Sequence, residues 1–230
     1  MDFDLSLPEL EQPPLFQFEE ASAGAVELFP TVWSACEELV SPDPALRHKG
    51  LGQLMALGAP RLSPLVAYLL STRLADPDAA LRARAAQALG GLLLPDLEGR
   101  PTPEPVRRYL VAALSQMRTR SIYALLEVAY DGPDTAASVA RLLNVCPYAG
   151  KHLVEILNER KLPLTIRRAA VDFIGSVGYL EAIPALERLA TRLEARLGGQ
   201  QSMPFAPPAV QDETDLLPVV QAALVMLKAP

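Results

Sequence analysis

A helical pattern that recurs along the chain constrains the fold more than any other feature of the sequence. Its clearest copy is residues 76–92, where five apolar residues fall on one face at helical spacing: Leu81, Ala85, Ala88, Leu89 and Leu92. We expect Asp76 to cap this helix and Pro77 to take its first position, since a carboxylate accepts from the end N–H groups and proline needs none there. A helix this short cannot bury its apolar stripe alone, so it must stack against neighbours.

Two further copies of this pattern occur in the chain. Leu46-Arg47 matches Leu81-Arg82, and an Asp-Pro pair precedes both. Residues 166–175 match residues 81–90 apolar position for apolar position. The interval between these last two copies leaves room for two units of about 40 residues, the period of paired-helix solenoids. The sequence therefore predicts a stack of helical hairpins.

The Asp-Pro, Leu-Arg, Ala-Ala and Leu-Gly signals, followed by Glu181-Ala182-Ile183-Pro184-Ala185-Leu186, resemble a bacterial HEAT or HEAT-like repeat. The match is good over 42–94 and 163–197 and weaker over 103–160. The resemblance implies an all-α fold, a right-handed α-α superhelix of about five hairpins with an extended concave surface. It implies no particular reaction, although some HEAT-like families act as bilin lyases or alkylpurine glycosylases.

We divide the chain into four parts: an acidic, proline-containing N-terminal arm (1–22), the HEAT-like solenoid (23–197), a flexible loop (198–214) and a C-terminal capping helix (215–230). Within the solenoid, helices are expected at about 25–40 (with a break near Pro30), 43–57, 61–74, 76–94, 102–116, 119–130, 134–145, 149–160, 164–177 and 180–197. Gly58 is placed to end one helix in the left-handed conformation. Trp33 is expected to fill the end of the core.

The two ends of the chain leave alternatives open. The N-terminal arm, with Phe16 and Phe18 as its candidate contacts, either caps the first helix pair or fills a groove of this protein or of a partner. The last helix either caps the solenoid or contacts another subunit. The arm and the last helix are therefore the two candidate surfaces for oligomerisation.

Charge is distributed unevenly along the chain. Residues 1–46 hold ten carboxylates and no basic residue, whereas the rest holds 21 basic and 17 acidic residues. The pI near 5.1 and the modest basic excess after residue 46 argue against a nucleic-acid partner, because DNA and RNA binding requires a strongly basic face. We therefore expect the partner to be a protein.

Other features place the chain in the cytoplasm. No run of 18 apolar residues indicates a membrane span, and the acidic N-terminus does not resemble a secretory signal. Cys36 and Cys146 each lie within or beside an apolar helical pattern, so we expect buried thiols in a reducing compartment.

No pattern in the sequence indicates catalytic, cofactor-binding or metal-binding residues. The two histidines, His48 and His152, each adjoin a lysine on a predicted helix and are expected to face solvent. The two cysteines are too far apart in the sequence for zinc-ligand spacing, and neither Gly-Gly pair is followed by the Lys-Ser/Thr of a phosphate loop. We therefore expect no enzyme activity and no cofactor.

Arginine is the remaining polar signal, with 17 arginines against 4 lysines. Three arginines occupy equivalent repeat positions and are expected to form a structural ladder: Arg47, Arg82 and Arg167. Five others in the less regular middle are candidates for a charged, partner-binding part of the concave face: Arg107, Arg108, Arg118, Arg120 and Arg141. The leading hypothesis is a non-catalytic scaffold or assembly subunit that binds a protein through this face. The alternative is a HEAT-like bilin lyase or chaperone for a chromophore or cofactor.

Overall fold

The computed structural model describes residues 25–200 and 212–229, and this part of the chain is helical without any strand. Its α-helices are α1 (Pro30–Leu39), α2 (Pro44–Ala56), α3 (Ala59–Leu62), α4 (Pro64–Thr72), α5 (Ala79–Leu92), α6 (Glu104–Ser115), α7 (Thr119–Val128), α8 (Pro133–Val145), α9 (Ala149–Asn158), α10 (Leu164–Val177), α11 (Ile183–Gln200) and α12 (Leu217–Lys228). Short 3₁₀ helices lie at Ala25–Leu28, Arg73–Ala75, Leu180–Ala182 and Glu213–Leu216. The predicted all-α class is confirmed.

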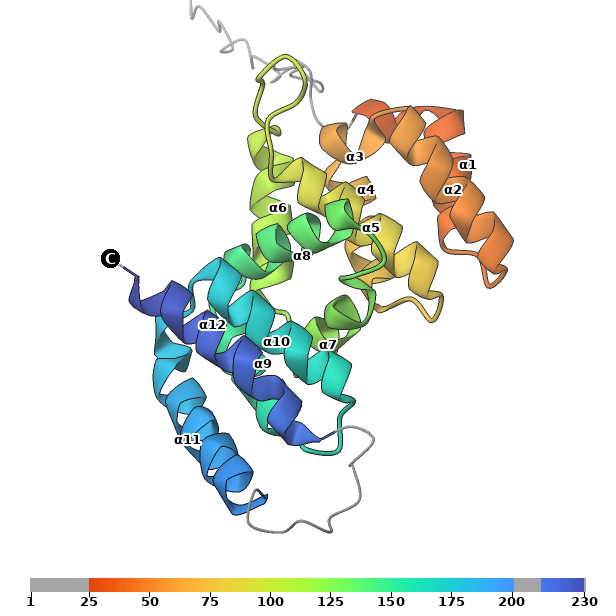
Figure 1. Ribbon diagram of the computed structural model, residues 1–230. Helices are drawn as coiled ribbons and strands as arrows, with labels where there is room; N and C mark the ends of the chain where they lie inside the picture. The colour runs from red at the N-terminus through yellow and green to blue at the C-terminus, as the bar shows by residue number, and fades with distance from the viewer. Residues whose placement is uncertain (1–24, 201–211, 230) are drawn as a thin grey trace, which may run out of the picture.

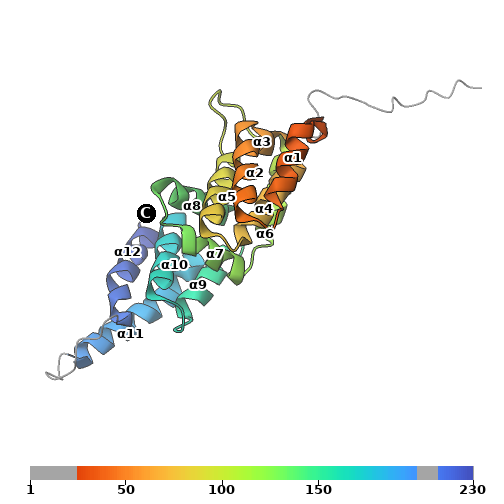
Figure 2. The ribbon, with the colours of Figure 1, turned by 90° about the vertical axis from the view of Figure 1, so that its right-hand side faces the viewer.

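The helices are stacked from one end of an elongated molecule to the other (Figure 1). In Figure 2, α1 and α2 lie at one end, and α11 and α12 lie at the opposite end. The closest helix pairs are α1 with α2, α4 with α6, α5 with α8, α9 with α10, and α10 with α12. One cluster of buried side chains, mostly leucine, alanine and valine, runs through all of them. Small core residues allow this close helix packing.

The start and the end of α2 follow the sequence prediction. The Asp43 carboxylate accepts from the Ala45 N–H at 2.9 Å, with proline in the first helical position. Beyond its end, Gly58 has a φ of 64°, the left-handed conformation that glycine adopts without a Cβ penalty.

The single helix predicted at 61–74 is divided into α3 and α4. Because Pro64 restricts the preceding residue to an extended conformation, Ser63 leaves the helical region, with φ −128° and ψ 120°. The Ser63 hydroxyl then accepts from the Val66 N–H at 3.1 Å and starts a new helix. The break makes α3 a separate element between α2 and α4.

The prediction that Asp76 caps the next helix is wrong. Asp78 is the N-cap of α5, and its carboxylate accepts from the Leu81 N–H at 3.1 Å. Asp76 is buried, and its carboxylate accepts instead from the Asp78 N–H and from Arg47 and Arg73. These tertiary partners, and not the end of the helix, determine the position of Asp76.

The expected start at Thr102 is also wrong. The hydroxyl of Thr102 donates to the carbonyl of Leu92 at 2.6 Å, so it ties the long loop before α6 to the end of α5. Pro103 holds the N-cap position and α6 begins at Glu104. The helices predicted from 119 to 177 agree with the structure to within about two residues, the usual uncertainty of helix ends, whereas α11 begins and ends three residues after the predicted 180–197.

The predicted break near Pro30 is confirmed, since a 3₁₀ helix precedes α1 there.

Trp33, by contrast, is not a core residue. In α1 the buried positions are Val32, Ala35, Cys36 and Leu39. Trp33 lies outside this stripe, is 56% exposed, and donates its indole N–H to Glu37 at 2.8 Å. Both cysteines are buried, as predicted.

The boundaries predicted near the C-terminus also change. α11 continues through Gly198 and Gly199 to Gln200, and a 3₁₀ helix begins at Glu213, so residues 198–200 and 213–214 of the predicted loop (198–214) are helical. The arm at 1–22, with Phe16 and Phe18, lies outside the described residues. Within the described ranges, no helix combines the length and the apolar character needed to cross a bilayer.

Two helix pairs make equivalent close contacts. A Cβ added to Gly90 of α5 would lie 2.6 Å from the Cβ of Ser138 on α8, and one added to Gly175 of α10 would lie 3.0 Å from the Cβ of Ala223 on α12. The offset in sequence from Gly90 to Gly175 equals the offset from Ser138 to Ala223, and it is also the offset between the two sequence copies. α8 and α12 therefore occupy corresponding positions against α5 and α10.

Candidate functional site

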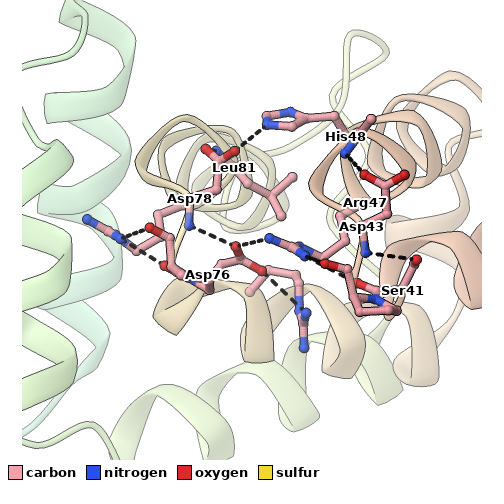
Figure 3. Close-up of polar contacts among 12 residues, drawn as sticks. Ser41, Asp43, Arg47, His48, Asp76, Asp78 and Leu81 are labelled. Atoms are coloured by element: carbon pink, nitrogen blue, oxygen red, sulfur yellow. Dashed lines mark hydrogen bonds and ion pairs between the residues drawn. The ribbon is translucent and has the colours of Figure 1, made fainter.

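Arg47 connects the beginning of α2 with the beginning of α5 (Figure 3). Its Nη1 donates to the carbonyls of Ser41 and Pro42 at 3.2 and 2.8 Å, just before α2. Its Nη2 donates to Asp76, near the start of α5, at 2.9 Å. Arg47 is 6% exposed, so these contacts leave little of its side chain open to a partner.

Arg82 and Arg167 make the same kind of contact further along the chain. Arg82 donates to the carbonyls of Asp76 and Pro77 and, from Nη2, to Glu127 of α7 at 3.1 Å. Arg167 donates to the Leu157 carbonyl at 2.7 Å and to Glu213, which precedes α12. Arg47 and Arg82 thus join the segment before their own helix to a carboxylate of a later element, whereas Arg167 joins the end of α9 to such a carboxylate. Charge-assisted bonds of this kind are strong and directional.

The Glu213 carboxyl is the most heavily paired of these acids. Burial alone would raise its pKa, but the hydrogen bond and charge of Arg167, together with the charge of Arg192, outweigh burial and hold the pKa below its ordinary value. The carboxylate of Glu213 is therefore ionised in the folded protein and stabilises the junction of α10, α11 and α12.

His48 does not face solvent freely, contrary to expectation. Its Nε2 lies 3.1 Å from Asp78 Oδ2, and its Nδ1 lies 3.2 Å from Nη1 of Arg84 (Figure 3 shows the Asp78 contact). Because a guanidinium only donates, Nδ1 must accept and Nε2 must carry the hydrogen. The pKa of Asp78 is held below its usual value, first by the Leu81 N–H and then by His48. The arrangement orients Arg84.

His152 is likewise held in a polar cluster. Its Nδ1 lies 2.9 Å from the Thr119 hydroxyl and 3.1 Å from Glu155, and that hydroxyl also donates to Glu155 at 2.7 Å. A nucleophilic triad needs the base to contact the nucleophile and the acid through opposite ring nitrogens. Here both partners share one nitrogen, so the cluster ties α7 to α9 and does not activate Thr119.

A pocket of about 580 Å³ lies between the end of α2, α3 and the outer face of α5. Ten residues line it: Met55, Gly58, Pro60, Arg61, Leu62, Arg84, Gln87, Ala88, Gly91 and Leu92. Most of this lining is apolar. Its size falls within the range of about 300–1,000 Å³ typical of ligand sites.

Arg61 and Arg84 give this pocket its charge. Arg61 donates to the carbonyls of Gly91, Leu94 and Arg100, and Arg84 donates to His48. Neither guanidinium forms an ion pair with a carboxylate within residues 25–200 and 212–229. The bonds to neutral groups fix the two cations in place without a carboxylate partner among the described residues. An apolar pocket with two such cations is suited to a ligand that combines carboxylates with apolar groups.

The five arginines expected on a partner-binding face lie on three helices. Arg107 and Arg108 of α6 both face Glu104 and are well exposed. Arg118 and Arg120 lie at the start of α7, beyond the other end of α6, and both are exposed. Arg141 of α8 is half-buried and donates to the Gly90 carbonyl at 3.3 Å. None of these five lines the 580 Å³ pocket.

Metal chemistry finds no support in the described ranges, where no three histidine, cysteine or carboxylate side chains gather in a metal-binding group. Comparison with known proteins adds no assignment: no protein-family model matches the chain, and neither curated proteins nor solved structures give a significant match. The pocket of Arg61 and Arg84 is therefore the candidate functional site on its geometry alone.

Sequence reasoning missed this pocket. Its two arginines belong to different helices, and only the turn at Gly58 and the break at Ser63 bring α3 against α5. The pair Ser63-Pro64, a capping residue before a proline, was the available signal for that break.

Proposed function

We propose that this chain is a non-catalytic protein-binding module, a scaffold or assembly subunit, that holds an acidic, apolar segment of a partner protein in the pocket of Arg61 and Arg84. The observation that carries this proposal is the pair of cations without ion pairs, among the described residues, in an apolar pocket. Carboxylates of the segment pair with the two guanidinium groups, and its large apolar side chains pack on Met55, Leu62 and Leu92.

The proposal includes an α-solenoid architecture of the HEAT-like kind. The contacts of α5 with α8 and of α10 with α12 are related by the same offset as the two sequence copies, and this supports a repeating unit. Solenoids present extended surfaces along which a partner segment can lie. In this architecture the pocket is one subsite of a longer binding surface.

A display library of random short peptides tests the proposal. Selection on the wild-type protein should enrich peptides that combine Asp or Glu with aromatic or large aliphatic residues. Binding of these peptides should be lost in Arg84→Glu and retained in Arg120→Glu, a matched change of an exposed arginine outside the pocket. Circular dichroism confirms that both variants are folded. Equal binding by the two variants, or enrichment without acidic residues, contradicts the proposal.

The size of the same pocket favours a second function, a bilin lyase or chromophore chaperone. A volume of about 580 Å³ is that of a small-molecule site, and a linear tetrapyrrole carries two carboxylates that Arg61 and Arg84 could pair. Co-expression with a bilin should then give a purified protein with visible absorbance that is lost in Arg84→Glu. A colourless wild-type protein contradicts this alternative.

A further inference from the structure

Residues 1–24 of this chain have the composition that the pocket of Arg61 and Arg84 suits. They contain six carboxylates and no lysine, arginine or histidine. They also contain seven leucine and phenylalanine residues: Phe3, Leu5, Leu7, Leu10, Leu15, Phe16 and Phe18. These residues lie outside the described ranges. Charge and apolar character are both complementary to those of the pocket.

The order of residues within this segment matches the pocket more closely still. In an extended chain, alternate side chains point to the same side. Phe16, Phe18 and Glu20 therefore share one side when the chain binds in an extended form. This gives two aromatic groups followed by a carboxylate, facing a surface of apolar walls and a guanidinium.

The described structure also places the beginning of α1 near the pocket. α1 begins beside the end of α2, because Pro30 and Thr31 line a smaller hollow together with Ala56 and Leu57. The next residue, Gly58, lines the pocket of Arg61 and Arg84. Residues 21–24 link Glu20 to the first described residue, and an extended chain spans about 3.3–3.6 Å per residue. An extended linker therefore lets Glu20 reach about 16 Å from Ala25, the residue at which the described chain begins.

We propose that residues 16–20 of this chain bind in its own pocket, with Phe16 and Phe18 against the apolar walls and Glu20 on Arg84. The segment then competes with the partner for the same site and sets the threshold for partner binding. This inference rests on the proposed function, since it takes the pocket to be a site for acidic, apolar segments.

Tethering sets the expected size of the competition. A short flexible linker holds a segment at an effective concentration of the order of 1 mM. If the free segment binds with a dissociation constant of about 10–100 μM, the tethered segment occupies the pocket about ten to one hundred times more often than it leaves it empty. A ligand added from solution should therefore bind the intact chain about ten- to one-hundred-fold more weakly than a chain whose own segment cannot bind.

The test uses the full chain and a fluorescent synthetic peptide of residues 9–24 as the probe, with binding followed by fluorescence anisotropy. Full-length F16S/F18S should bind this peptide at least about tenfold more tightly than the wild type, because the tethered competitor is removed. F3S, which removes the same kind of side chain from the same segment but outside residues 16–20, should behave as the wild type. Adding R84E to F16S/F18S should abolish binding.

Equal binding by wild type and F16S/F18S overturns the inference, as does the absence of peptide binding to every variant. The display selection on wild type and Arg84→Glu is independent of both results. A failure of the binding by residues 16–20 can therefore be told apart from a failure of the proposed function. Light scattering should show a wild-type monomer. A wild-type dimer that F16S/F18S dissociates assigns the pocket to the segment of a second copy and contradicts binding within one chain.

Discussion

Replacing Gly90 of α5 with alanine should push α5 away from α8, because Gly90 packs directly against Ser138 of α8. The new Cβ would lie 2.6 Å from the Cβ and 2.8 Å from the Cα of Ser138, whereas carbon atoms pack at about 3.5–4.0 Å. α5 and α8 must therefore separate by about 1 Å, and such overpacking costs about 1–3 kcal/mol. Alanine recovers about 0.5–1 kcal/mol of helix propensity. We expect a net loss of about 1–2 kcal/mol in the free energy of unfolding.

The adjacent residue provides a matched control. A Cβ on Gly91 meets no atom within 4 Å, so Gly91→Ala should stabilise the protein by about 0.5–1 kcal/mol. Gly175→Ala, with Ala223 at 3.0 Å, should fall between the two. Urea unfolding followed by far-ultraviolet circular dichroism, with equal m-values, measures all three. If Gly90→Ala is as stable as Gly91→Ala, the close packing of α5 on α8 is refuted.

Four further substitutions test the polar contacts by the same unfolding measurement. Arg167→Met removes the buried partner of Glu213, which keeps Arg192, and should cost about 2 kcal/mol. Arg107→Met removes an exposed pair and should cost less than about 1 kcal/mol. Similar costs would contradict the burial of the Arg167 pair. Because the folded pKa of Glu213 is lowered, its stabilisation is complete above the unfolded pKa of about 4.3 and is lost as pH falls through the folded value. In Arg167→Met the free energy of unfolding should therefore fall less steeply at acid pH. An unchanged pH profile would show that the Arg167–Glu213 pair is not the cause of this pH dependence. Asp78→Ala should cost about 1 kcal/mol, because α5 loses its N-cap. Asp76→Ala should cost about 3 kcal/mol, because the buried Arg47 loses its carboxylate partner. A larger cost for Asp78→Ala than for Asp76→Ala would indicate that Asp76 is the cap after all.

Helical periodicity was sufficient to predict most of the helices. The apolar stripes are local properties of the sequence, and the turn signals at Asp43 and Gly58 act on their own neighbours. For that reason α2 and α10 agree closely with the sequence prediction. These signals require no knowledge of which helices meet.

The sequence predictions were wrong at positions where contacts with other helices decide the role of a residue. Asp76 and Asp78 are close neighbours and equally good caps by type, and the choice depends on Arg47, which belongs to α2. Trp33 has the size of a core residue, but the stripe of α1 passes beside it. His48 and His152 have polar partners from other helices.

The candidate site was harder to predict than the fold. It requires a broken helix at Ser63, which moves Arg61 onto α3, and it requires α3 to meet Arg84 of α5. Neither arginine lies in a distinctive sequence motif, because the site is formed only by packing. The five arginines selected by sequence were chosen for their poor match to the repeat, a criterion that does not measure proximity.

Nuclear magnetic resonance of the arginine side chains can show directly whether an acidic peptide binds at Arg61 and Arg84. A display-selected acidic peptide is titrated into the isotope-labelled full chain, and the guanidinium Nε–H signals are followed. If the peptide binds in the pocket, the signals of Arg61 and Arg84 should shift and those of Arg107, Arg118 and Arg120 should not change. Shifts confined to Arg107, Arg118 and Arg120 would contradict binding in the pocket and move the binding site to the face formed by α6 and α7.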